Sequence, residues 1–203
     1  MKKQILILSL FLICSIVSQA ANYSLTIDGK SMDVDLGQPV EFQTKDGDML
    51  NIVLNKKEII RFESDFFSMK HKSSLNPIKS DLGDGLYQTV MMSALGSGLL
   101  LQEYHSMDPS ALIDLMIQEL TKEEVGYGYR KKVESIEKKV GDLVLQGKKA
   151  VTAYKDEEWT RCVYAFGKKD AGILIITMIE KENYQSEGFI ISDFWRTLEL
   201  VIK

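Results

Sequence analysis

The side chains of this sequence best suited to nucleophilic or metal chemistry are a cysteine, Cys162, and two histidines, His71 and His105. A thiolate attacks as a nucleophile when a neighbouring base takes up its proton, and either histidine has the right chemistry for that base. Alternation along the surrounding strand places Cys162 on the same side as Tyr164 and Phe166, and that side is apolar if it faces the core. We therefore expect a buried structural thiol that does not react in the native fold.

The spacing of these residues does not indicate a metal site. Zinc needs three or four converging ligands, and neither histidine has a cysteine or carboxylate neighbour at ligand spacing. Residues 46–48 (DGD) and 81–84 (DLGD) resemble the start of a calcium loop, but neither continues into the spaced oxygen donors and final glutamate of an EF-hand. The sequence predicts turns at both places, and no metal ion or other cofactor.

The glycine-rich motif at residues 96–98 (GSG) is better explained as a hairpin turn than as a phosphate-binding loop. A phosphate-binding loop leads into a helix and carries Gly-Lys-Ser or Gly-Lys-Thr, and neither feature follows here. The sequence also contains no Gly-x-Ser-x-Gly elbow and no His-Glu-x-x-His motif. No catalytic residue can be assigned, and a non-catalytic role is favoured.

One segment, residues 126–132 (GYGYRKK), has the composition of a surface contact. The rings of Tyr127 and Tyr129 precede Arg130 and two lysines, a combination that can stack on a sugar, a peptide or an anionic group. The alternative is that a ring packs over the end of the preceding helix while the cations are solvated or offset two nearby glutamates. Tyr127, Tyr129 and Arg130 are the candidate contacts with a partner.

The start of the chain has the features of a cleavable secretory signal. Lys2 and Lys3 precede an apolar run over residues 5–17, and the small residues Ser18 and Ala20 stand where a signal peptidase reads. The run is shorter than the roughly 20 residues that cross a bilayer core. We expect residues 1–20 to be removed, without a stable membrane anchor. The mature protein is expected in the periplasm, with the cell surface or the medium as alternatives.

The cysteine inside the signal, Cys14, raises the alternative of a lipoprotein. Lipidation requires small residues before the cysteine, whereas Leu12 and Ile13 are large. Cys14 is therefore better explained as a small hydrophobic residue of the signal. Cleavage would leave Cys162 as the only cysteine, so no internal disulfide is expected.

Residues 21–62 show the period-two alternation of short β-strands. Apolar residues recur at every second position in four segments, 23–27, 32–36, 40–42 and 50–54. The pairs Asp28-Gly29 and Asp46-Gly47 lie between strands and accept the positive φ angles of a tight hairpin. We predict a small antiparallel β-meander.

Residues 63–203 have a different rhythm, because two amphipathic helices interrupt a series of strands. Asp108 can cap the first helix and Pro109 can begin it, with an end near Glu123. The second helix is expected to start near Ser186 and to bury one apolar stripe. The predicted order is β-β-β-α-β-β-β-β-α.

The strands of this part differ in how much of their surface they must bury. They are predicted at 66–71, 87–95, 99–105, 132–138, 143–154, 159–166 and 172–180. Residues 173–179 are almost continuously apolar, which implies cover on both faces of a central strand. Residues 73–85 contain several Asp, Gly and Pro residues and are expected to form a polar connection. Gly147 is predicted to mark a bulge.

The order of elements and the local sequence over residues 63–203 resemble the Mog1/PsbP-like superfamily. The resemblance is carried by residues 66–67 (FF), the Asp108-Pro109 helix start, residues 143–151 (LVLQGKKAV) and residues 189–200 (FIISDFWRTLEL). It implies an α+β fold in which two helices flank a mainly antiparallel sheet. Members generally act as non-catalytic binding or assembly factors, and bacterial ones are often exported. The N-terminal β-meander lies outside the pattern.

Together these features predict an exported, non-catalytic binding or assembly factor of the bacterial envelope. The net charge of −4 disfavours nucleic acid, so a protein or surface ligand is the expected partner. One alternative is an envelope hydrolase whose site is dispersed in the sequence. The other is a carbohydrate- or surface-binding module that uses Trp159 and Tyr154.

Overall fold

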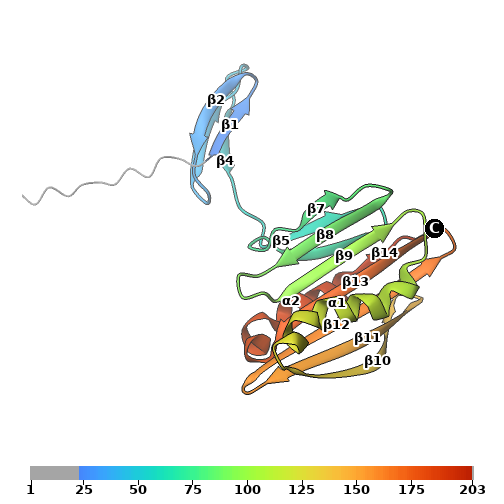
Figure 1. Ribbon diagram of the computed structural model, residues 1–203. Helices are drawn as coiled ribbons and strands as arrows, with labels where there is room; N and C mark the ends of the chain where they lie inside the picture. Colours follow the sequence, from blue (N-terminus) through green and yellow to red (C-terminus); the bar gives the residue numbers. More distant parts are fainter. Residues whose placement is uncertain (1–22, 203) are drawn as a thin grey trace, which may run out of the picture. The chain divides into compact units, whose positions relative to one another are not determined.

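The computed structural model describes residues 23–202, which form two compact units that meet in the sequence between Lys56 and Lys57 (Figure 1). The expected secretory signal, residues 1–20, lies outside the described residues. Between residues 23 and 202, no helix is long and apolar enough to cross a membrane.

The first unit contains the predicted strands, arranged as two hairpins. They are β1 (Tyr23–Ile27), β2 (Lys30–Val34), β3 (Pro39–Gln43) and β4 (Met49–Val53). β1 pairs antiparallel with β2, and β3 with β4, while a parallel bridge joins Leu36 to Leu54. The first hairpin turns at Asp28 and Gly29, which both have positive φ angles. The Asp-Gly pair therefore sets the pairing of these strands, as predicted.

The second unit begins at Lys57, ahead of the boundary expected at Phe62, because the strand β5 (Ile59–Glu63) belongs to it. β5 pairs antiparallel with β6 (Phe67–Lys72), whose other neighbour is β14 (Glu199–Leu200). This three-stranded sheet joins the beginning of the unit to its end. The last residues of the expected closing helix are therefore a strand.

A seven-stranded antiparallel sheet forms the centre of the second unit, in the order β10-β11-β12-β13-β9-β8-β7. Its strands are β7 (Ile78–Asp81), β8 (Leu86–Met92), β9 (Gly98–Tyr104), β10 (Arg130–Val140), β11 (Leu143–Tyr154), β12 (Glu157–Lys168) and β13 (Ala171–Glu180). β7 lies where a polar connection was expected. It has no apolar alternation to detect, because all of its residues are exposed.

The first helix begins where the sequence predicts. Asp108 accepts a hydrogen bond from the amide of Ser110 at 2.9 Å, and Pro109 stands in the first turn. A short 3-10 helix, Pro109–Leu112, leads into α1 (Ile113–Gly126). The helix ends slightly later than predicted.

The second helix, α2 (Tyr184–Thr197), begins before the expected cap at Ser186. A 3-10 helix, Lys181–Asn183, precedes it, so Ser186 lies inside the first turn and donates to the carbonyl of Asn183 at 3.3 Å. The chain becomes extended at Leu198 and continues into β14.

The two helices cover opposite faces of the seven-stranded sheet (Figure 1). Alternate residues of β13 point to different faces: Ile173 and Ile175 belong to the core on the α2 side, whereas Leu174 and Ile176 belong to the core on the α1 side. All four are 0% exposed, so β13 is covered on both faces as its apolar sequence predicts. The α+β fold, with a mainly antiparallel sheet flanked by two helices, is confirmed.

Gly147 in β11 marks a close approach, not the predicted bulge. β11 pairs residue by residue with β10 and β12 through this position, with no inserted residue. A Cβ atom at Gly147 would lie 2.5 Å from the carbonyl oxygen of Val163 and 2.7 Å from the ring of Tyr164. Glycine is needed here because another backbone and an aromatic ring occupy that space.

Candidate functional site

A groove of about 610 Å³ lies between α2 and the strands β10, β12 and β13. This volume is within the range of small-molecule sites in proteins. The residues that line it come from the sheet on one side and from a single stripe of the helix on the other. We consider it the candidate functional site of the second unit.

The helix wall of the groove follows from the spacing of four residues of α2. Tyr184, Gly188, Ile191 and Trp195 are four, three and four positions apart, which places them on one stripe of the helix. The neighbouring stripe carries Phe194, which is buried in the core. Core packing therefore fixes the helix while the groove stripe is left facing the open space.

The floor of the groove is built by side chains that alternate along two paired strands. Thr160 and Cys162 of β12 line it, as do Thr177 and Ile179 of β13. Cys162 stands directly opposite Thr177, and Thr160 directly opposite Ile179. All four therefore share the face that α2 covers. The four side chains of the floor are uncharged, and all except Ile179 are small.

Aromatic rings close one end of the groove. Tyr164 and Trp195 meet edge to face, with ring centroids 5.0 Å apart and an interplanar angle of 78°. The ammonium of Lys138 lies 5.1 Å from the centroid of the Trp195 ring. The ring of Tyr164 is able to lie in this place because Gly147 has no side chain.

The charged residues that line the groove are all cations: Lys138, Lys139 and Arg196. Arg196 forms an ion pair with Asp193 at 2.8 Å. Within residues 23–202, neither lysine has a carboxylate oxygen within 4.0 Å of its ammonium nitrogen. In a chain with a net charge of −4, this is a local excess of positive charge.

Cys162 lies on the floor of the groove and is only partly buried, whereas the sequence predicted a buried structural thiol. Tyr164 and Phe166 do share its side of the strand, but α2 does not cover this part of the sheet completely. Burial raises the pKa of the thiol, and hydrogen bonding to Tyr164 and Thr177 opposes that effect only in part.

The raised pKa predicts slow alkylation of native Cys162, because the thiolate is the reactive form. At pH 7.5 we expect labelling by iodoacetamide to be more than about tenfold slower than in urea-unfolded protein. The rate should increase with pH, as the thiolate fraction does. Labelling of the native protein as fast as that of the unfolded chain would contradict an unreactive thiol. The reaction is followed by mass spectrometry.

Neither histidine lies in the groove with Cys162. His71 is buried, and its Nδ1 is 2.9 Å from the carbonyl oxygen of Lys72. The ring of His105 stacks on Phe66, with centroids 4.3 Å apart. The structure therefore does not bring together the cysteine and the histidines whose pairing a nucleophilic mechanism would require.

His105 takes part in a cluster that the sequence analysis missed, because Glu103, two residues before it, was not counted as a neighbour at ligand spacing. One ligand atom each from Asp65, Glu103 and His105 lie within 4.8 Å of one another. The ammonium of Lys79 is 3.3 Å from a carboxylate oxygen of both Asp65 and Glu103. Glu103 is 1% exposed and also accepts a hydrogen bond from Ser64. The lysine offsets the charge of the two carboxylates, so the cluster is accounted for as a structural network.

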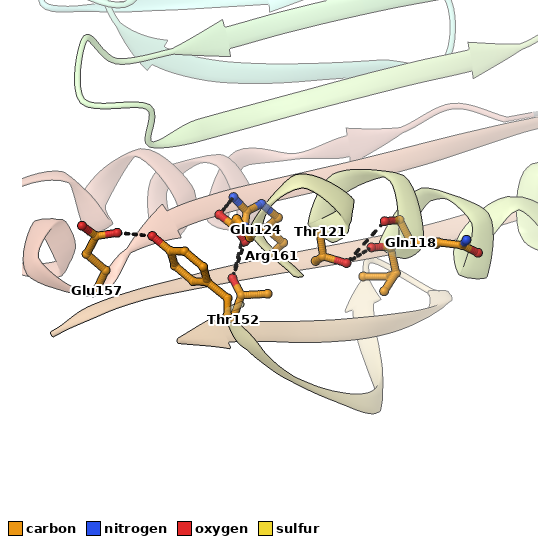
Figure 2. Close-up of polar contacts among 8 residues, drawn as sticks. Gln118, Thr121, Glu124, Thr152, Glu157 and Arg161 are labelled. Atoms are coloured by element: carbon orange, nitrogen blue, oxygen red, sulfur yellow. Dashed lines mark hydrogen bonds and ion pairs between the residues drawn. The ribbon is translucent and has the colours of Figure 1, made fainter. Parts of the chain in front are cut away.

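A second polar cluster connects α1 to the face of the sheet that it covers, which is the face opposite the groove (Figure 2). Arg161 of β12 donates to both carboxylate oxygens of Glu124, at 2.8 and 2.6 Å, and the hydroxyl of Thr152 donates to the same carboxylate at 2.5 Å. The side chains of Arg161 and Glu124 are only 11% and 18% exposed. This pair holds the end of α1 on the sheet, and no local sequence signal links residues so far apart.

The structure separates the three residues of the predicted contact segment. Tyr127 is 80% exposed. The ring of Tyr129 lies against Tyr154, and its hydroxyl donates to Glu157, which raises the pKa of Tyr129 to about 12. Arg130 is exposed at the start of β10. Of these three residues, only Tyr127 offers an exposed aromatic ring. Tyr129 instead packs against the hairpin of β11 and β12 through Tyr154 and Glu157.

The two aromatic residues considered for carbohydrate binding do not form one platform. The ring of Trp159 is half-buried, lies 5.1 Å from the guanidinium carbon of Arg161, and would be 3.3 Å from a Cβ atom at Gly96. Tyr154 is 43% exposed and packs against Tyr129. Both rings therefore pack against side chains of the fold, at separate places.

Comparisons with known proteins identify similar folds. No protein-family model matches the chain, and no curated protein matches it. A crystal structure from Bacteroides thetaiotaomicron is similar over 70% of this chain, with a TM-score of 0.41 and 16% sequence identity. This chain covers 48% of that protein, about half its length.

The solution structure of cyanobacterial PsbP from Synechocystis is similar over 71% of this chain and 93% of that protein, with a TM-score of 0.43 and 5% identity. The name of that protein corresponds to the PsbP-like resemblance that the sequence predicts. At these identities the similarities concern the fold alone.

Proposed function

We propose that the protein is an exported, non-catalytic binding or assembly factor of the bacterial envelope, and that its ligand or partner binds in the groove along α2. The observation that carries the proposal is the groove itself. It combines a large open volume with aromatic and aliphatic walls and with unpaired cations. Such a lining provides apolar area and charge for recognition.

Export is supported by the residues that precede the described part of the chain. Lys2 and Lys3, the apolar run over residues 5–17 and the small residue Ala20 are the features that a secretory signal needs. Removal after Ala20 should give a mature protein that starts at Ala21. Fractionation of the producing cells, with the mass of the protein in each fraction, tests this part of the proposal. An intact precursor as the stable form in the cytoplasm would contradict it.

Substitution of Ile191 by Glu is expected to reduce capture of the partner at least about tenfold. The tagged mature protein is used to capture ligands and proteins from envelope extracts, which are identified by mass spectrometry. Ile191→Glu places a negative charge in the groove, beside the apolar surface that the partner would cover. Leu115→Glu is the matched control, because Leu115 is 52% exposed on α1, away from the groove.

We expect the Leu115→Glu variant to capture what the unchanged protein captures, and the Ile191→Glu variant to lose at least about tenfold in yield. Equal yields from both variants would show that the groove is not the binding site. Tyr127→Ala, examined in parallel, tests the exposed ring as a second contact. Its effect on stability should be small because the ring is 80% exposed.

A further inference from the structure

We infer that the groove binds an elongated apolar carboxylate, such as a medium-chain fatty acid, and that Gly188 keeps the space that the alkyl chain occupies. The inference rests on the proposed function, in which the groove is the binding site. It adds the chemical class of the ligand, the direction in which the ligand lies, and the residue that sets how much of it fits.

The direction follows from how charge is distributed along α2. Tyr184 is the first residue of the helix and Trp195 is eleven positions later, so the groove stripe is about 16 Å long at 1.5 Å per residue. The cations Lys138 and Arg196 lie at the Trp195 end. The lining residues of α2 that precede Arg196 are all uncharged, from Tyr184 onward. A carboxylate therefore fits at one end and an apolar chain along the rest.

The preference for an anion follows from the groove's lining. Three of its residues are cations, none is a carboxylate, and Lys138 and Lys139 lack a carboxylate partner among the residues that the structure describes. A bound carboxylate would accept charge-assisted hydrogen bonds from these ammonium groups in a partly desolvated place. A bound cation would be repelled by Lys138 and Lys139, for which no carboxylate partner compensates.

Gly188 has no structural reason to be glycine. It stands inside α2, where glycine is less favourable than alanine, and its φ angle is helical. A Cβ atom built at this position would meet nothing within 4 Å. Packing within the protein therefore does not exclude a side chain here. The missing side chain instead leaves the middle of the groove open, between the apolar end and the cationic end.

This contrast separates Gly188 from the glycines that the fold itself requires. At Gly147 a Cβ atom would collide with a carbonyl oxygen at 2.5 Å. At Gly98 the corresponding distance to a carbonyl oxygen is 2.2 Å. Gly126, the last residue of α1, also has open space around it but lies outside the groove. Gly188 keeps free space inside a helix that lines the groove, at a cost to helix stability, and that space is where an alkyl chain would lie.

The test is a calorimetric titration of the mature protein with hexanoate, octanoate and decanoate, and with octanamide as the neutral counterpart of octanoate. Affinity should rise roughly fourfold for each added methylene group that the groove buries. Octanamide should bind at least about fivefold more weakly than octanoate, since it lacks the charge that Lys138 and Arg196 recognise. Substitution of Lys138 by Met should remove most of that difference.

Two substitutions at Gly188 separate binding from folding. Gly188→Ala should raise the melting temperature by about 1–4 °C, because alanine favours the helix and the added methyl group meets no neighbour. It should also weaken decanoate binding. Gly188→Leu fills the space and should reduce decanoate affinity at least about tenfold in a protein that still unfolds cooperatively. Gly126→Ala, at the end of α1, is the control and should leave binding unchanged.

Equal affinity for octanoate and octanamide would overturn the anionic class while leaving the groove as an apolar site. Undiminished decanoate binding to Gly188→Leu would place the site elsewhere. If the unchanged protein binds none of the probes, and Ile191→Glu still loses its partner, the inferred ligand class is wrong and the proposed function stands. If Ile191→Glu also retains its partner, both fail.

Discussion

Substitution of Glu124 by Ala is expected to destabilise the second unit by about 3 kcal/mol, because it leaves the guanidinium of Arg161 without its partner at the edge of the core. The two side chains are 18% and 11% exposed, and Arg161 donates to both carboxylate oxygens of Glu124. Water therefore replaces the lost carboxylate poorly. Thr152 also loses the acceptor of its hydroxyl group. Urea denaturation followed by circular dichroism gives the free energy of unfolding.

A double-mutant cycle identifies the ion pair as the cause. Arg161→Met should also destabilise the unit, since it removes both hydrogen bonds to the Glu124 carboxylate. The double variant should lose less than the sum of the two single variants, because each single variant leaves an uncompensated charge whereas the double variant leaves none. Glu123→Ala, on the exposed neighbour of Glu124, is the control and should change the free energy by less than about 0.5 kcal/mol. Additive losses would show that the pair is not coupled.

The parts of the fold that the sequence predicts are those with a local physical signal. Asp108 and Pro109 mark a helix start through the capping geometry of two adjacent residues. The run from Ile173 to Ile179 shows that its strand is covered on both faces of the sheet, because an exposed face would need polar residues at alternate positions. Such signals lie within a few residues of one another, and sequence reading detects them.

The elements that were missed have no such signal. The four residues of β7 are all exposed and only Ile78 is apolar, so no alternation distinguishes the segment from a loop, and its pairing with β8 makes it a strand. β14 is two residues long and is fixed by its pairing with β6, which lies at the other end of the second unit. Gly147 looks like a bulge from one strand alone. Glycine is required at this position because the backbone and a ring of the neighbouring strand occupy the space of a side chain.

The candidate site was not predictable for the same reason. The groove takes its lining from four elements, and Lys138 meets Trp195 only because its side chain lies on the face of the sheet that α2 covers. Within the helix, the spacing of Tyr184, Gly188 and Trp195 could have been noticed in the sequence, as one stripe interrupted by a glycine. The stripe alone would not have shown that it faces open space.

Substitution of Gly147 by Ala should destabilise the second unit by about 2 kcal/mol and displace the aromatic rings at one end of the groove. The new methyl carbon would lie 2.5 Å from the carbonyl oxygen of Val163, a backbone atom held in the pairing of β11 with β12, and 2.7 Å from the ring of Tyr164. The sheet cannot yield without loss of ladder hydrogen bonds, so the ring must move. Tyr164 then leaves its edge-to-face contact with Trp195, which closes one end of the groove.

The same chemical change at Gly188 provides the control, because the structure predicts the opposite sign. Alanine at Gly188 meets nothing within 4 Å and removes an unfavourable glycine from a helix, so it should stabilise the protein by about 0.5–1 kcal/mol. Urea denaturation measures both free energies, and tryptophan fluorescence reports whether the surroundings of Trp195 have changed. Equal stabilities of the two variants would mean that the close approach at Gly147 is relieved without cost, and that the ring of Tyr164 is not held by it.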